Sequence, residues 1–224
     1  MLPLYDTVRT HKFPLINLVL IVSNILVFLY EQQLSPTMLE RFVFTWGWVP
    51  AHLASNPSAA WITVFTAMFL HGSWIHLLGN MWFLYIFGDN IEARLGGARY
   101  LIFYLLSGVA AAFLQTYAQP GSQVPTIGAS GAIAGVLGAY LISFPRARVA
   151  SLVPILFIFT IVEIPAVIFL AFWFIIQIYS GLFVMQGANA AGIAWWAHVG
   201  GFVFGLIMVS FFAIRPAYRN WYQE

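Results

Sequence analysis

The feature that most constrains this chain is a series of long apolar stretches that contain almost no charged residues. Of its 224 residues, 62% are hydrophobic and 7% are charged, whereas a soluble domain carries about 25% charged residues. So few charges could not cover a water-facing surface. A helix that crosses about 30 Å of hydrocarbon needs roughly 20 residues. The sequence therefore predicts helices whose main solvent is lipid.

Six apolar stretches have about the length of a membrane helix. They cover residues 14–31, 74–91, 98–118, 129–145, 163–185 and 194–214. We therefore expect an all-α membrane protein, with a six-helix domain at 14–214 between short termini at 1–13 and 215–224. The residues after the first stretch do not form a small-residue cleavage site, so we expect that helix to be retained.

Two connections between these helices are themselves apolar. The run from Val149 to Val184 is too long for one helix and is interrupted by Pro154, Glu163 and Pro165. We expect 149–162 to be an interfacial or partly embedded connection, with the fifth helix beginning near Glu163. Residues 32–73 are rich in tryptophan and poor in charge, which favours a position in the outer membrane interface.

The basic residues predict the orientation of the bundle. With six spans both termini lie on one side of the membrane. That side holds eight of the nine basic residues, namely Arg9, Lys12, Arg94, Arg99, Arg146, Arg148, Arg215 and Arg219, with Arg41 opposite. Cytoplasmic loops carry the excess of lysine and arginine, so we expect both termini to be cytoplasmic. A minimal chain without a transit peptide suggests a prokaryotic plasma membrane.

Composition and spacing exclude several classes of site. The chain has no cysteine, which rules out disulfides and thiolate catalysis, and its net charge of +2 is too small to suggest a nucleic-acid partner. His71 and His76 are five residues apart without an intervening acid. A helical zinc motif needs a spacing of four with a glutamate between the histidines. We therefore expect no metal and no cofactor.

Polar side chains inside a membrane are costly and usually face the bundle interior. His76 and Asn80 are four residues apart, so they share one face of a helix and could offer hydrogen-bond donors to a common point. An equally acceptable interpretation is that they hold helices together. His71 lies at or before the start of this helix, which favours a structural role.

The fourth helix opens with Gly128-Ala129-Ser130-Gly131. Glycine on both sides of a serine allows other groups to approach its hydroxyl. A helix N-terminus offers unpaired N–H groups and positive potential, which suit a developing oxyanion. Taken alone, such a serine is more often a packing residue in a membrane helix.

The sixth helix carries a histidine beside a stripe of small residues. Ala197, Gly201 and Gly205 recur every four residues, and Gly131, Gly135 and Gly138 form a similar stripe on the fourth helix. Such stripes allow helix backbones to approach closely. Close packing explains the glycines but does not explain His198, which borders the stripe.

Ser130, His198 and His76 share one predicted depth. Each lies 16 or 17 residues before the charged residue that ends its helix, respectively Arg146, Arg215 and Glu92. At 1.5 Å per residue, all three lie about 24–26 Å from the inner boundary. A serine hydroxyl needs a base within hydrogen-bond reach, and His198 is the best candidate. No acidic third member is convincing, so the sequence favours a serine–histidine dyad.

At this point the sequence resembles the rhomboid family of intramembrane serine proteases, from about Leu70 to Gly205. The matching strings are His71-x4-His76-x3-Asn80, Glu92-Ala-Arg94-Leu-Gly96, Gly128-Ala-Ser130-Gly131 and Ala197-His198-x2-Gly201-x3-Gly205. The resemblance implies a six-helix rhomboid core and a Ser130–His198 dyad. It further implies an oxyanion site formed by His76, Asn80 and the Ser130 amide. The remaining matched residues are expected to be structural, namely His71, Gly128, Gly131, Gly201, Gly205, Glu92 and Arg94.

The resemblance also implies the partners. Members of this family cut the transmembrane segments of other membrane proteins near their extracytoplasmic ends, and their fifth helix is thought to control lateral access. Here that helix would be about 163–185, which contains Gln177. Transmembrane segments and lipid are therefore the expected partners.

Two features depart from the family pattern. Some members carry an aromatic residue four positions after the serine, where this chain has Ala134. Another group must then orient His198, or the cavity is roomier. Some members also have a Trp-Arg pair in the first outer loop, where this chain has Trp46-Gly-Trp48.

Two other functions compete with proteolysis. A non-catalytic rhomboid-like protein would bind membrane helices without cutting them, but such relatives lack the serine or the histidine. A small transporter would need ionisable groups along a path through the membrane, whereas here the polar groups gather at one level.

Overall fold

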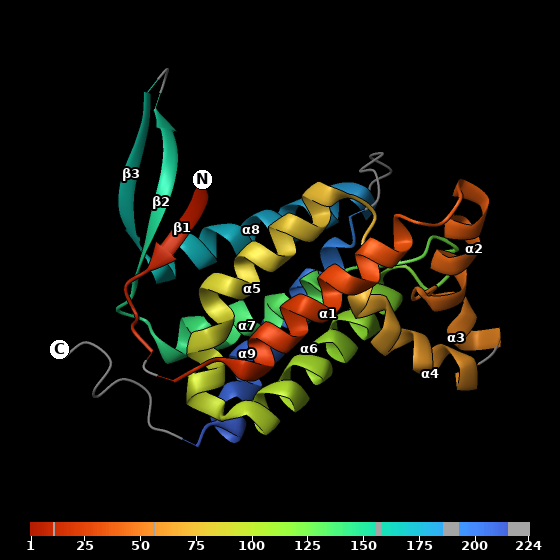
Figure 1. Cartoon of the computed structure of the whole chain (residues 1–224), viewed down its shortest axis with the longest axis horizontal. Helices are drawn as coiled ribbons and strands as arrows, with labels where there is room; N and C mark the ends of the chain where they lie inside the picture. The colour runs from red at the N-terminus through yellow and green to blue at the C-terminus, as the bar shows by residue number, and fades with distance from the viewer. Residues whose placement is uncertain (11, 56, 156–157, 186–192, 215–224) are drawn as a thin grey trace.

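The long helices are bundled side by side along the long axis of the molecule (Figure 1). The computed structural model describes residues 1–224 apart from 11, 56, 156–157, 186–192 and 215–224. The bundled helices are α1 (Leu15–Glu31), α5 (Trp74–Leu95), α6 (Gly97–Ala118), α7 (Ser130–Ser143), α8 (Ala166–Met185) and α9 (Trp195–Phe212). Their ends agree with the predicted spans to within four residues. The predicted C-terminal tail, with Arg215 and Arg219, lies outside the described residues.

Length and composition identify part of this bundle as membrane helices. Among the described residues, α6, α8 and α9 are each long and apolar enough to cross a bilayer, and the pair Ala60–Phe69 and Trp74–Leu95 passes as one span bent by 85°. The apolar helices α1 and α7 are shorter, with 17 and 14 residues. The prediction of a helical membrane bundle is therefore confirmed, while the number of six spans stays a prediction.

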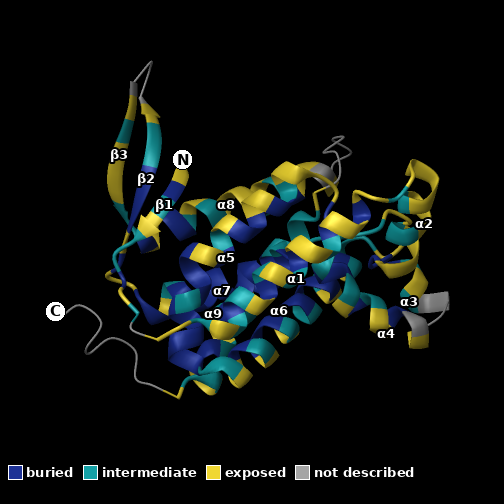
Figure 2. Ribbon diagram, in the orientation of Figure 1, coloured by how far each residue is buried: buried dark blue, intermediate teal, exposed yellow. Residues whose placement is uncertain are grey.

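Helix α7 lies at the centre of the bundle, where Figure 2 shows it almost entirely buried. Glycines allow α9 to approach it closely. A Cβ atom at Gly201 would collide with the carbonyl oxygen of Gly131, and one at Gly205 with that of Gly135. The predicted small-residue stripes therefore meet each other in the folded chain, and the backbone contact fixes the position of α9 against α7.

The bundle has an apolar core that also contains several buried polar side chains, and much of its outer surface is apolar. Asn17, Ser107 and Gln115 are buried, whereas large apolar side chains such as Leu26, on α1, and Ile175, on α8, are exposed. An exposed apolar surface of this kind suits a lipid surrounding, because lipid tails replace the water that a soluble protein would face.

The connection between α1 and α5 forms a layer of short helices at one end of the bundle (Figure 1). Its members are α2 (Pro36–Trp46), α3 (His52–Ser55), α4 (Pro57–Thr66) and the 3-10 helix η1 (Ala67–Phe69). Ser35 begins α2 by accepting a hydrogen bond from the Met38 amide at 3.4 Å. Trp48 is buried and pairs through its backbone with Thr126, which precedes α7. This layer therefore supports the N-terminal end of α7.

A three-stranded antiparallel sheet lies at the other end of the molecule (Figure 1). It consists of β1 (Leu2–Asp6), β2 (Arg148–Ile155) and β3 (Ile158–Pro165), with Asp6 opposite Val149 and Arg148 opposite Pro165. The expected connection at 149–162 is thus mostly a β-hairpin, and Glu163 lies in β3 rather than at the start of a helix. Isoleucine and valine recur along this run and favour extended backbone.

Candidate active site

Ser130 is the first residue of α7, and the chain before it is held by a backbone hydrogen bond. The Gly128 amide donates to the Ala67 carbonyl oxygen at 2.9 Å. Gly128 has φ of +120°, a conformation that side-chain-bearing residues rarely adopt. The turn therefore needs glycine, and it delivers the serine to the helix N-terminus, where amide groups have no partner within the helix.

His198 lies in the first turn of α9, opposite this serine. Its Nε2 atom is 2.8 Å from Oγ of Ser130. The start of α9 is held by Gln115 of α6, whose Oε1 accepts a hydrogen bond from the Ala197 amide at 3.2 Å. The structure therefore brings together the two residues that the sequence predicted as partners, although they are 68 positions apart in the chain.

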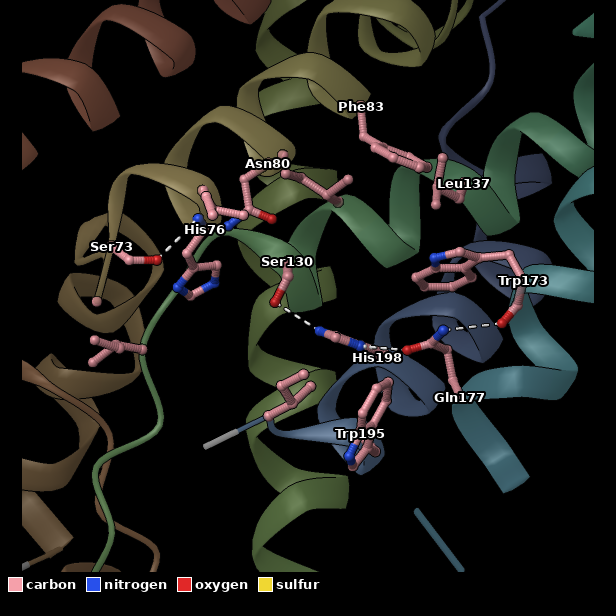
Figure 3. Close-up of a pocket in the computed structure, with 16 residues that line it drawn as sticks. Ser73, His76, Asn80, Phe83, Ser130, Leu137, Trp173, Gln177, Trp195 and His198 are labelled. Carbon is pink, nitrogen blue, oxygen red and sulfur yellow. Dashed lines mark hydrogen bonds between the residues drawn. The ribbon is translucent and has the colours of Figure 1, made fainter. Parts of the chain in front are cut away.

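His76 and Asn80 project from α5 toward the same place (Figure 3). A Cβ atom on Gly128 would lie 2.6 Å from Nε2 of His76 and 3.6 Å from Nδ2 of Asn80. The missing side chain at Gly128 thus leaves room for both nitrogens beside Ser130. Ser73 caps α5 by accepting a hydrogen bond from the His76 amide at 3.2 Å, which fixes the start of this helix.

His71 supports Asn80 from behind. Nδ2 of Asn80 lies 2.9 Å from Nε2 of His71, and the His71 amide donates to the Glu31 carboxylate at 3.2 Å. Because the asparagine amide nitrogen can only donate, Nε2 of His71 accepts this bond. His71 is buried, and its contacts agree with the structural role that its position predicted.

A glutamine on α8 contacts the other side of the imidazole. Oε1 of Gln177 is 2.8 Å from Nδ1 of His198, and Nε2 of Gln177 donates to the Trp173 carbonyl oxygen at 3.0 Å. Sequence reasoning placed Gln177 on this helix without giving it a role. The sequence signal that could have identified it is a single amide side chain within an apolar run, four residues after Trp173. The rings of Trp173 and Trp195 also approach His198, with centroids 5.9 and 6.2 Å from its own.

These groups line one cavity of about 620 Å³. Its polar lining includes Ser73, His76, Asn80, Ser130, Gln177 and His198. Phe83, Leu137 and Trp173 form part of its apolar wall (Figure 3). Within the described part of the chain, no group of three or more His, Cys, Asp or Glu side chains could hold a metal ion. The histidine beside Ser130 can activate its hydroxyl, and the neighbouring side chains of His76 and Asn80 can offer hydrogen bonds to an oxyanion.

The other matched residues lie away from the cavity. The Glu92 carboxylate accepts hydrogen bonds from the amides of Ile16 and Asn17, at 3.1 and 2.7 Å, and so caps the start of α1. Gly96, with φ of +78°, joins α5 to α6. Arg94 is buried beside it, and its carbonyl oxygen accepts a bond from the Ile214 amide at 3.4 Å. These residues hold the opposite end of the bundle together.

The family of the chain follows from comparison with known proteins. The bundle and its serine–histidine pair define a helical membrane protein with a hydroxyl group placed for activation. The sequence matches the Rhomboid domain over residues 58–215. This match covers more than half of the chain, and the chain belongs to the rhomboid family.

Several curated proteins are similar to the chain. RHOMBOID-like protein 1 of Arabidopsis thaliana is 31% identical over 162 residues, which are 72% of this chain and 37% of that protein. Presenilin-associated rhomboid-like protein, mitochondrial, of Homo sapiens is 31% identical over 147 residues, 63% of this chain and 36% of that protein. Rhomboid-like protein 11, chloroplastic, of Arabidopsis thaliana is 40% identical over 77 residues, 34% of this chain and 27% of that protein. The chain thus spans about a quarter to two fifths of the length of these relatives.

Proposed function

We propose that this chain is an intramembrane serine endopeptidase that uses a Ser130–His198 dyad. The observation that carries the proposal is the 2.8 Å contact between Oγ of Ser130 and Nε2 of His198 at the wall of a 620 Å³ cavity. A transporter would need ionisable groups along a path, and the cavity instead gathers its polar groups around one hydroxyl.

The first half of the reaction forms an acyl-enzyme. Oγ of Ser130 attacks the carbonyl carbon of the scissile peptide bond while its proton passes to Nε2 of His198. The carbonyl oxygen becomes an oxyanion beside the Ser130 amide, His76 and Asn80, which stabilise it as donors. His198 then gives the proton to the departing amine, and the peptide bond breaks.

The second half of the reaction releases the acyl group. A water molecule in the cavity attacks the ester carbon, and Nε2 of His198 takes the proton of that water. Collapse of the second oxyanion returns the proton to Oγ of Ser130, which restores the starting state. Water in the bilayer core must occupy a protein-lined space, and the cavity between α5, α7, α8 and α9 offers one.

The proposed substrates are the transmembrane segments of other membrane proteins, cut near their extracytoplasmic ends. An apolar cavity wall at Phe83 and Trp173 suits an apolar segment better than a soluble, charged peptide. We further propose that both termini lie in the cytoplasm, on the basis of the distribution of lysine and arginine, and that the membrane is a prokaryotic plasma membrane.

The proposal is tested by incubating the purified protein in proteoliposomes with a panel of single-span substrates. The wild type should release fragments, and Ser130→Ala and His198→Ala should not. If both variants still bind the spans, and the wild type binds them equally without cutting, the chain is a helix-binding rhomboid-like protein instead.

A further inference from the structure

The amide of Gln177 is the strongest unassigned feature of the cavity. Gln177 lies in the middle of α8, is 4% exposed and points inward, while its neighbours Ile175 and Ile176 are exposed at the outer surface. Burying an amide in an apolar helix costs free energy unless its hydrogen bonds are satisfied. One of its two hydrogen bonds goes to the Trp173 carbonyl oxygen within α8, and the other goes to His198. The contact with His198 gives this buried amide a role in the site.

The hydrogen bonds of Gln177 fix the tautomer of His198. Nε2 of Gln177 donates to the Trp173 carbonyl oxygen, so its Oε1 atom faces Nδ1 of His198 at 2.8 Å. An amide oxygen can only accept, so Nδ1 must carry the hydrogen. Nε2 of the neutral ring is then unprotonated and faces the Ser130 hydroxyl at 2.8 Å. This is the tautomer that a general base requires.

The plane of the imidazole is held by the same helix. The Trp173 ring lies at 34° to the imidazole with centroids 5.9 Å apart, and Trp195 of α9 meets its edge at 84°. Two of these three neighbours, Gln177 and Trp173, belong to α8. They occupy the role left open by Ala134, which is too small to stack on the histidine.

Helix α8 is the least enclosed of the long apolar helices. In the most apolar stretch of each helix, 28% of the residues of α8 are buried, compared with 33% for α9 and 44% for α6. A hydrogen bond of 2.8 Å is lost when its atoms separate by about 1 Å more. An outward displacement of α8 by about this distance would therefore break the hydrogen bond between Gln177 and His198. The positions of Ser130 on α7 and His198 on α9 need not change.

We propose that Gln177 is a positioning residue that keeps His198 in its base-competent tautomer only while α8 is docked against α9. The inference rests on the proposed proteolytic function and adds a means of control to the same site. Because the amide is neutral, it orients the ring without adding a charge to the membrane interior, where an aspartate would be costly. Lipids that displace α8 would then lower the reactivity of Ser130.

The test is the rate at which a small fluorophosphonate labels Ser130 in detergent micelles, because this reagent does not need a transmembrane segment to reach the site. Gln177→Met keeps the length of the side chain and removes the acceptor. We expect it to lower the labelling rate and kcat at least tenfold with KM within twofold. Gln177→Glu keeps an acceptor and should recover at least a third of the wild-type rate. Ile176→Met is the matched control on the same helix and should label as the wild type does.

A second measurement reads the tautomer directly. In protein with ¹⁵N-labelled histidine, the wild-type signal of His198 should show a protonated Nδ1, and Gln177→Met should shift population to the Nε2-protonated form. An unchanged tautomer together with an unchanged labelling rate would overturn the proposal. A wild type that does not label at Ser130 would overturn the proposed function itself, so the two failures are distinguishable. Melting temperatures separate a positioning effect from loss of the fold.

Discussion

At the scale of single residues, the site depends on which atom donates and which accepts. Asn80 lies next to the serine because its Nδ2 atom bonds to His71, and His71 is in turn held by Glu31. These hydrogen bonds join Glu31, His71 and Asn80 in one buried polar chain, which ends at Glu31. The spacing to His76 left Asn80 open between a donor and a helix-packing residue, and the family resemblance predicted the donor. The sequence did not reveal that His71 orients Asn80, because that contact depends on the bend between η1 and α5.

The first prediction concerns this donor. Asn80→Ala should lower kcat about 100-fold, which corresponds to roughly 3 kcal/mol of transition-state stabilisation, while KM changes little. The measurement is steady-state cleavage of a single-span substrate. Asn24→Ala is the control, because Asn24 is buried in α1 and bonds to the Leu20 carbonyl oxygen of its own helix. Equal kcat for the wild type and Asn80→Ala would remove Asn80 from the oxyanion site.

A second prediction at this scale concerns the pKa of Asp6, in β1 outside the membrane helices. Burial raises this pKa from 3.8 to about 7, opposed by a hydrogen bond from Tyr140. The folded state thus binds the proton more tightly than the unfolded state. The protonated Asp6 carboxyl therefore contributes to the stability of the fold. This contribution is complete below about pH 4 and is lost as the pH rises to about 7.

The melting temperature in detergent should therefore fall between pH 5 and pH 8 in the wild type, and it should fall less in Asp6→Asn, by a difference of several degrees. The variant retains an oxygen that can accept from Tyr140. Parallel melting curves for the two proteins across this range would show that Asp6 does not titrate as the structure implies.

At the scale of helices and strands, close approach of backbones decides the geometry. A side chain at Gly201 would push α9 away from α7, and with it His198 from Ser130. Gly201→Ala should therefore lower the melting temperature by several degrees and reduce labelling of Ser130 by at least tenfold, since added atoms in a tight contact typically cost about 1–3 kcal/mol. Gly121→Ala, where no atom lies within 4 Å of the added carbon, should change neither. Normal labelling of Gly201→Ala would contradict this packing.

The position of α8 can be tested with a reversible tether. A Cβ atom on Gly181 would lie 3.4 Å from that of Trp195, close to the ~3.5–4.5 Å found in disulfides. The chain has no natural cysteine, so the double variant Gly181→Cys and Trp195→Cys forms one defined bond. Its oxidised form should label at Ser130 at least as fast as its reduced form, because the tether keeps α8 docked. Slower labelling after oxidation would show that the docked position is not the reactive one.

Sequence reasoning located the helices more accurately than the connections between them. An apolar run of about 20 residues can hardly be anything other than a membrane helix, and α6 begins and ends within one residue of its predicted span. The hairpin of β2 and β3 was missed because an apolar run rich in isoleucine and valine fits either a strand or an embedded segment. The strand that pairs with β2, β1, lies more than 140 residues away in the chain. No local sequence pattern could therefore indicate this pairing.

At the scale of the whole molecule, the chain is a membrane bundle with two distinct ends. The layer of α2 to α4 covers the end where α7 begins, and the sheet lies at the other end, in contact with α5 and α8 (Figure 1). The pairing of Ser130 with His198 could be proposed from motif spacing and shared depth, because both can be counted along the sequence. The contact with Gln177 could not, because it depends on how α8 is rotated against α9.

The proposed orientation is tested with single cysteines. Thr37 and Ala98 are exposed, at the two opposite ends of the bundle. In intact cells a membrane-impermeant maleimide should modify Thr37→Cys, and it should modify Ala98→Cys only after permeabilisation. The reverse pattern would place the termini outside the cytoplasm.

The central claim is that His198 makes Ser130 a nucleophile. The most direct measurement is the mass of the intact protein, and of its peptides, after exposure to a fluorophosphonate. We predict a single adduct on Ser130 in the wild type and none in His198→Ala. A protein that gains no adduct, or that carries it on another serine, would contradict the account.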